Sequence, residues 1–64
     1  MQNTIRKQFE EYLKLSGQKA RYIAGKINLH EVTLSKWRRN RENLPDKNLI
    51  KITNYIMDNK GKFL

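Results

Sequence analysis

The sequence contains no cysteine, one proline and one histidine. Without cysteine, no disulfide and no thiolate-bound zinc can reinforce the fold. The single histidine, His30, has no partner at the spacing of a metal site or a catalytic pair. The chain also lacks a phosphate-cradling glycine loop, a nucleophile elbow and a carboxylate cluster. We therefore expect no catalytic residues, no metal, no cofactor and no small-molecule substrate.

Long hydrophobic runs are also missing. No apolar stretch approaches the roughly 18 residues that a membrane-spanning helix needs, and the N-terminal segment MQNTIRKQFEEY lacks the apolar centre of a signal peptide. These observations predict a cytoplasmic protein with no membrane partner. A basic amphipathic protein on a membrane surface is the alternative, disfavoured because the apolar stripes are split among short helices separated by turns.

Positive charge is abundant. Fourteen Lys and Arg residues face six Asp and Glu residues, which gives a net charge of +8 and a pI of about 10.1. This balance is typical of nucleic-acid-binding domains, although small basic proteins also bind ribosomes or acidic partners, and charge also keeps proteins soluble. A chain of 64 residues forms one domain with a narrow stability margin. A second copy is therefore a natural source of additional stability.

Apolar periodicity predicts a first helix over residues 4–15. Asn3 or Thr4 is expected to cap its start, and Gly17 is expected to end it in a left-handed conformation. The opposite face is charged, and we expect it to be solvated, with Glu10 and Lys14 spaced for an ion pair. The apolar face is formed by Ile5, Phe9, Tyr12 and Leu13, and the charged face by Arg6, Lys7, Glu10, Glu11 and Lys14.

A second helix is predicted over residues 18–27, where small residues such as Ala20 and Ala24 on the inner stripe permit a crossing helix to approach closely. Asn28 suits a left-handed turn position, because Asn tolerates positive φ better than any residue except Gly. Leu29 is then expected to pack in the corner between this helix and the next one. This pattern predicts a tight turn directly after the second helix.

The third helix is predicted over residues 31–40, with Leu34 and Trp37 facing inward. His30 would occupy its N-cap position, although histidine is not among the preferred capping residues. Trp37 invites a role in stacking on unpaired bases, but its place on the inner stripe favours core packing.

A polar loop over residues 40–44 leads to a fourth helix that begins at Pro45 or Asp46 and ends near Asn59. This helix is apolar over more than one face. Either it packs centrally against the other three helices, or part of its surface joins two copies in a homodimer. The candidate dimer residues are Ile50, Tyr55 and Met57. Residues 61–64 form a tail, in which Phe63 and Leu64 either fold back or fray.

Residues 13–56 resemble the lambda-repressor-like helix-turn-helix family, which includes the phage Cro and repressor proteins. Ile23-Ala24 stands at the family's Leu-Ala pair, and residues 28–30 stand at its Gly-Val-Ser turn. The segment TLSKW, residues 33–37, stands at its Ser-Thr-Ile-Ser-Arg-Trp-like stretch, and Asn40 stands where Gly is common. The resemblance implies an all-α fold, a compact helix-turn-helix domain of four to five helices over residues 3–60.

The resemblance also implies a transcriptional regulator of the phage or mobile-element repressor type. Such a protein binds double-stranded DNA sequence-specifically and inserts one helix, here the helix over residues 31–40, into the major groove. Residues near the start of such a helix touch base edges, while the preceding helix crosses the backbone. Lys36 can donate to guanine and Val32 can contact a thymine methyl group. The expected base-reading residues are Glu31, Val32, Thr33, Ser35 and Lys36.

Phosphate contacts are expected from basic and amide side chains around this helix. Ala20 replaces the Gln that typically grips a phosphate in the family, so neighbouring residues would take over. The expected phosphate-binding residues are Gln18, Lys19, Arg21, His30, Arg38, Arg39, Asn40, Arg41 and Lys47.

Simpler explanations exist for some of these residues. Glu31 can serve only to favour a helix N-terminus, and the basic run over residues 36–41 can be an ordinary solvated face. A rival function also remains open: a small phage-type protein whose basic helix-turn-helix surface binds and inhibits an acidic host protein.

Overall fold

The computed structural model describes residues 2–62, which form four α-helices and no strand. The all-α prediction is therefore confirmed. The helices are α1 (Gln2–Ser16), α2 (Ala20–Lys26), α3 (Glu31–Arg38) and α4 (Asp46–Lys60). Among these residues no helix is both long enough and apolar enough to cross a membrane. The expected placement of Phe63 and Leu64 lies outside the described residues.

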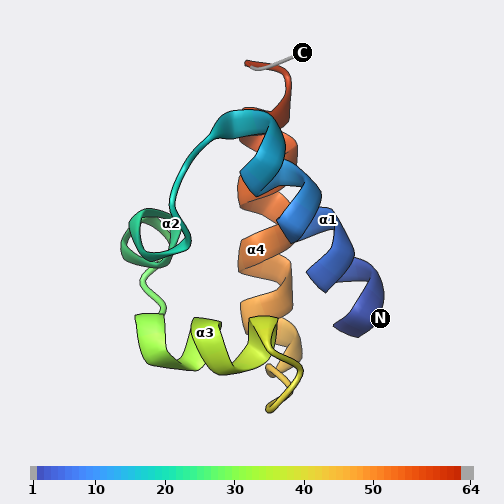
Figure 1. Cartoon of the computed structure of the whole chain (residues 1–64), viewed down its shortest axis with the longest axis vertical. Coiled ribbons are helices and arrows are strands. Elements are labelled where there is room, and N and C mark those ends of the chain that lie inside the picture. The colour runs from blue at the N-terminus through green and yellow to red at the C-terminus, as the bar shows by residue number, and fades with distance from the viewer. Residues whose placement is uncertain (1, 63–64) are drawn as a thin grey trace.

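The two long helices, α1 and α4, pack against each other, and the two short helices, α2 and α3, form a second packed pair. In Figure 1, α2 is seen end-on while α3 lies across the view, so the short helices cross steeply. The C-terminal end of α3 lies near the beginning of α4 at the lower end of the molecule (Figure 1). This arrangement leaves one side of the α2–α3 pair away from α1 and α4.

A single hydrophobic core joins all four helices. Phe9 and Trp37 are fully buried, and their rings meet edge to face with centroids 5.9 Å apart. This confirms that Trp37 packs inside rather than serving as a stacking platform. The core consists of Ile5, Phe9, Tyr12, Ile23, Ala24, Leu34, Trp37, Leu44, Leu49, Ile52 and Ile56.

The sequence pattern predicted a polar loop over residues 40–44 before α4, and this prediction was wrong at Leu44. Leu44 is only 3% exposed and belongs to the core. Gln2 holds its backbone: the Gln2 side-chain amide donates to the Leu44 carbonyl oxygen at 2.8 Å, and the Gln2 Oε1 accepts from the Leu44 N–H at 3.3 Å. The same oxygen accepts from the Trp37 indole N–H at 2.9 Å. Gln2 thereby satisfies backbone groups that burial of Leu44 removes from water.

Each of the three connections between the four helices contains a residue with positive φ: Gly17 at 72°, Asn28 at 57° and Asn40 at 61°. The predictions for Gly17 and Asn28 are confirmed. After α2, the Leu29 N–H donates to the Ala24 carbonyl at 2.9 Å, and Leu29 packs against the core. This bond closes the helix end as in a Schellman motif, in which a left-handed residue lets the next N–H reach back to a free carbonyl.

The predicted helix ends differ from the observed ends by up to two residues. The third helix ends at Arg38 rather than Asn40, because Asn40 is left-handed and the Arg41 N–H bonds back to the Lys36 carbonyl. The second helix begins at Ala20 rather than Gln18, because Lys19 is extended. The fourth helix begins at Asp46 as predicted, with Pro45 at its N-cap, and ends at Lys60, one residue beyond the expected Asn59.

The predictions for the N-terminal end of α1 were wrong in two respects. The helix begins at Gln2, so Asn3 and Thr4 lie inside it and do not cap it. Arg6, expected on the solvated face, is buried at 9% exposure. It donates to the backbone carbonyls of Trp37 and Glu42 and to the side-chain oxygens of Asn3 and Asn43. Burial of this cation is tolerated because its hydrogen-bond donors have partners.

Candidate nucleic-acid interface

Four of the five predicted base-reading residues line the outer side of α3, because Leu34 and Trp37 turn the opposite side into the core. Thr33 lines neither of the two depressions on that side. Glu31, Val32 and Lys36 are exposed, and Val32 exposes 49% of its surface despite its apolar side chain. Thr33 and Ser35 are half-buried. The helix thus presents a mixed surface in which a cation, a carboxylate and an apolar side chain lie within two turns. Those are the groups that distinguish base edges in a major groove.

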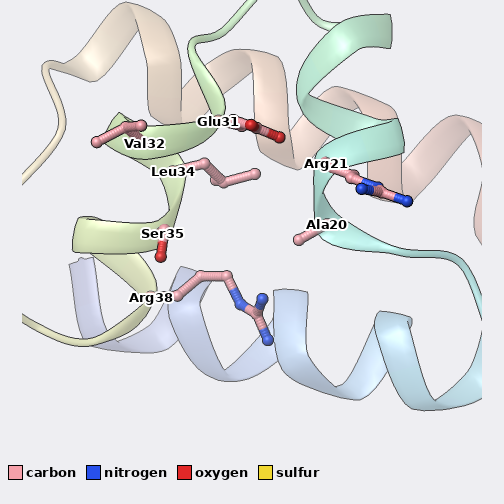
Figure 2. Close-up of a pocket in the computed structure, with 7 residues that line it drawn as sticks. All are labelled: Ala20, Arg21, Glu31, Val32, Leu34, Ser35 and Arg38. Atoms are coloured by element: carbon pink, nitrogen blue, oxygen red, sulfur yellow. The ribbon is translucent and has the colours of Figure 1, made fainter.

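A shallow groove of about 410 Å³ separates α2 from α3. We call it the interhelix groove, and Figure 2 shows its lining: Ala20, Arg21, Glu31, Val32, Leu34, Ser35 and Arg38. The side chains of Ala20 and Leu34 point toward each other across it (Figure 2). A longer residue at position 20 would fill this space, so the small alanine keeps the groove open. Arg21 and Glu31 flank it from different helices.

A second depression of about 450 Å³ lies along α3 and the residues that follow it. It is lined by Val32, Ser35, Lys36, Arg39, Arg41 and Glu42. We call it the basic hollow, since three of these six residues are cations. Val32 and Ser35 line both depressions, which makes the two adjacent. The structure therefore brings Arg39 and Arg41 together beside Val32, Ser35 and Lys36 of the predicted base-reading set. Glu42, which the sequence did not indicate, adds one carboxylate at the edge.

His30 caps α3 despite its low rank as a capping residue. Its Nδ1 accepts a hydrogen bond from the Val32 backbone N–H at 3.2 Å. An accepting Nδ1 places the proton of the neutral ring on Nε2. His30 thus holds the first turn of α3 and retains one outward donor for the phosphate contact that the sequence predicted.

Arg38 is engaged within the molecule. Its guanidinium donates to both carboxylate oxygens of Glu10, at 3.0 and 2.9 Å, which joins α3 to α1. It also lies 5.9 Å from the centre of the Phe9 ring. The prediction that Glu10 pairs with Lys14 is therefore wrong, because the tertiary structure gives Glu10 a planar, bidentate partner.

Gln18 also has an internal role. Its Oε1 accepts from the hydroxyls of Tyr12 at 3.1 Å and Tyr55 at 3.0 Å, which fixes the connection from α1 to α2 against α4. Burial raises the pKa of the Tyr55 phenol, and the adjacent Tyr12 raises it further. Gln18 was predicted to contact phosphate, but its side-chain oxygen is committed to this bridge.

The remaining predicted phosphate contacts are distributed unevenly. Lys19 and Arg21 are exposed at the start of α2, and Asn40 is exposed just after α3. Lys47 is exposed on α4 but lines neither the interhelix groove nor the basic hollow. The sequence between residues 19 and 41 contains seven Lys and Arg residues and one acidic residue, so this segment carries +6 of the total charge of +8. All seven cations are exposed.

The predicted dimer residues divide into two groups. Ile50 is 55% exposed and Met57 is 73% exposed, and both lie on α4. Tyr55 instead packs within the protomer, where its ring meets that of Tyr12 at 5.9 Å in an edge-to-face contact. A groove between α1 and α4 runs beside Ile50 and Met57, in two sections that share Gln8 and Thr53.

Within residues 2–62, no group of three or more metal-ligating side chains is present. Comparison of the chain with protein-family models, with curated proteins and with solved structures finds no match.

Proposed function

We propose that this protein is a sequence-specific, double-stranded-DNA-binding transcriptional regulator that inserts α3 into the major groove. One observation carries the proposal. The outer side of α3 presents Val32 and Lys36 beside Arg39 and Arg41, while its inner side is anchored in the core. A rigid helix with base-reading groups next to phosphate-binding cations is the arrangement that major-groove recognition requires.

The roles follow from side-chain chemistry. Lys36 donates to guanine O6 and N7, and Val32 with Thr33 contacts thymine methyl groups. Glu31 accepts from cytosine N4 or serves to favour the N-terminus of α3. Arg39, Arg41, Lys19 and Arg21 bind the phosphates that flank the groove.

The finer fold assignment is a lambda-repressor-like helix-turn-helix domain. It is supported by the steep crossing of α2 and α3, by the left-handed Asn28 between them, and by the small Ala20 in the groove between the helices. We propose that this protein represses by occupying a promoter, as phage or mobile-element repressors do.

The active form we propose is a homodimer. Ile50 and Met57 leave apolar surface uncovered on α4, seven residues apart on the same helix side. Two copies related by a two-fold axis would place their α3 helices in successive major grooves, about 34 Å apart, on an inverted repeat. Sedimentation at tens of micromolar that detects only monomer, with and without DNA, would contradict the dimer.

Selection of bound duplexes from a random pool tests the proposal directly. We expect enrichment of a palindromic motif, and we expect Lys36→Ala to lose one position of that motif. Failure of the folded protein to retain any duplex over competitor DNA would overturn the proposal. That result would favour the rival function, in which the basic surface docks on an acidic protein.

A further inference from the structure

Glu10 is an acidic residue at the margin of a basic surface. It comes from α1, yet its carboxylate reaches the C-terminal half of α3 and accepts two hydrogen bonds from the Arg38 guanidinium. The two side chains are partly exposed, Arg38 at 34% and Glu10 at 46%. The pair is therefore accessible to a competing anion from solvent.

The surroundings of this pair connect it to the candidate interface. A small depression of about 270 Å³ is lined by Glu10, Ser35, Arg38 and Arg39. Ser35 also lines the interhelix groove and the basic hollow. Arg38 lines the interhelix groove as well, and Figure 2 shows its side chain directed toward α1. A phosphate that approaches Arg38 or Arg39 through this depression therefore also meets the Glu10 carboxylate.

We propose that Glu10 is a specificity-determining residue, which competes with DNA phosphate for Arg38 and so suppresses binding to random sequence. The inference rests on the proposed function of α3 in DNA binding. Carboxylate and phosphate accept the same bidentate geometry from a guanidinium, so each can replace the other on Arg38. An exposed ion pair is weak enough for such an exchange.

The competition acts unequally on the two kinds of complex. Random-sequence binding depends almost entirely on phosphate contacts, each of which releases condensed counterions. In that mode Glu10 withholds Arg38 and repels nearby phosphates. In a specific complex the base contacts fix the register of the backbone, and a phosphate held in place displaces Glu10 from Arg38.

The test measures binding of full-length protein to a random-sequence duplex between 50 and 200 mM salt. For Glu10→Gln we expect about fivefold tighter binding at the lowest salt, as one exposed ion pair is removed. We also expect a slope of log affinity against log salt steeper by about 0.9, as one phosphate contact is gained. Affinity for a duplex selected from the random pool should rise less, so the ratio of specific to random affinity falls.

Glu11→Gln is the matched control. It changes the net charge equally, but Glu11 points about 100° away from Glu10 around α1, and it lines the groove shared with α4. It should leave the salt slope unchanged. In an Arg38→Gln background, Glu10→Gln should no longer steepen the slope, because the contested guanidinium is gone. Helicity and unfolding midpoints measured for every variant ensure that folded proteins are compared.

Three results would overturn the inference. Equal gains for Glu10→Gln and Glu11→Gln would show an effect of net charge alone. Weaker binding by Glu10→Gln would show that Glu10 positions Arg38 for DNA instead of withholding it. An unchanged slope would show that Arg38 does not reach phosphate. Failure of the wild-type protein to bind any duplex at 50 mM salt is a separate result, which would overturn the proposed function and the inference together.

Discussion

The guanidinium of Arg6 donates its Nε–H to the backbone carbonyl of Trp37 and lies 5.4 Å from the centre of the Trp37 ring. This contact ties the second turn of α1 to the last turn of α3, across 31 residues of sequence. The same cation reaches the Glu42 carbonyl at 2.9 Å. Arg6 thus fixes the loop that follows α3 and, with it, the position of Arg39 and Arg41.

Replacement of Arg6 by methionine should lower the free energy of unfolding by about 3 kcal/mol, because two backbone carbonyls lose a charged donor. Urea unfolding monitored by Trp37 fluorescence measures the change. Lys7→Met removes the same charge from an exposed neighbour, and it should alter stability by less than about 0.5 kcal/mol. Equal effects of the two substitutions would contradict the role of the Arg6 hydrogen bonds.

Two glycines should respond to alanine in opposite directions. Gly17 has a φ of +72°, where a Cβ is strained, whereas Gly25 lies inside α2 with open space around its added Cβ. We expect Gly17→Ala to destabilise by about 1 kcal/mol and Gly25→Ala to stabilise by about 0.8 kcal/mol. Thermal unfolding of both variants provides the comparison, and a shift of the same sign in both would refute it.

The cap of α3 should depend on an accepting side chain at position 30. His30→Ala removes the acceptor of the Val32 N–H, and we expect a loss of about 1 kcal/mol of stability. His30→Asn supplies a preferred capping oxygen without charge, so it should retain or exceed wild-type stability. Chemical denaturation separates the two, and an Asn variant as unstable as the Ala variant would exclude a capping role.

Base reading and phosphate binding should be separable on α3. Lys36→Ala is expected to cost about 1 to 3 kcal/mol on the preferred duplex and to relax specificity at one base pair. Arg39→Ala is expected to weaken specific and random duplexes alike and to flatten the salt slope by about 0.9. Binding titrations on both duplexes measure these effects. Equal loss on both duplexes for Lys36→Ala would remove Lys36 from the base-reading set.

Alkaline pH should destabilise the protein partly through Tyr55. Burial raises the pKa of Tyr55 above its ordinary value of 10.0, so the folded state holds the phenolic proton more tightly than the unfolded chain. That contribution is complete below about pH 10 and is lost as the pH rises through the raised pKa. Between about pH 8 and pH 11, the free energy of unfolding measured in urea should therefore fall less for Tyr55→Phe than for wild type. A Tyr55→Phe profile that coincides with the wild-type profile would show that Tyr55 does not contribute.

Local sequence patterns were sufficient to predict the helices, the turns and most of the core. Local periodicity is sufficient to place Leu34 and Trp37 on one side of α3, since residues three apart share a helix face. The left-handed turn at Asn28 is likewise a local preference of the residue. The exposed surface of Glu31, Val32 and Lys36 then follows, because it is the other side of the same helix.

The polar residues that act between helices, in contrast, could be recognised only from the packed fold. Arg6 and Glu10 looked like an ordinary solvated face, because the partners that reach them, Trp37 and Arg38, are 28 or more residues away in the chain. No local rule marks a buried arginine or a paired glutamate when the partner group is a distant carbonyl or guanidinium. Gln2 and Leu44, 42 residues apart, were missed for the same reason: their hydrogen bonds exist only after the core has brought the two segments together.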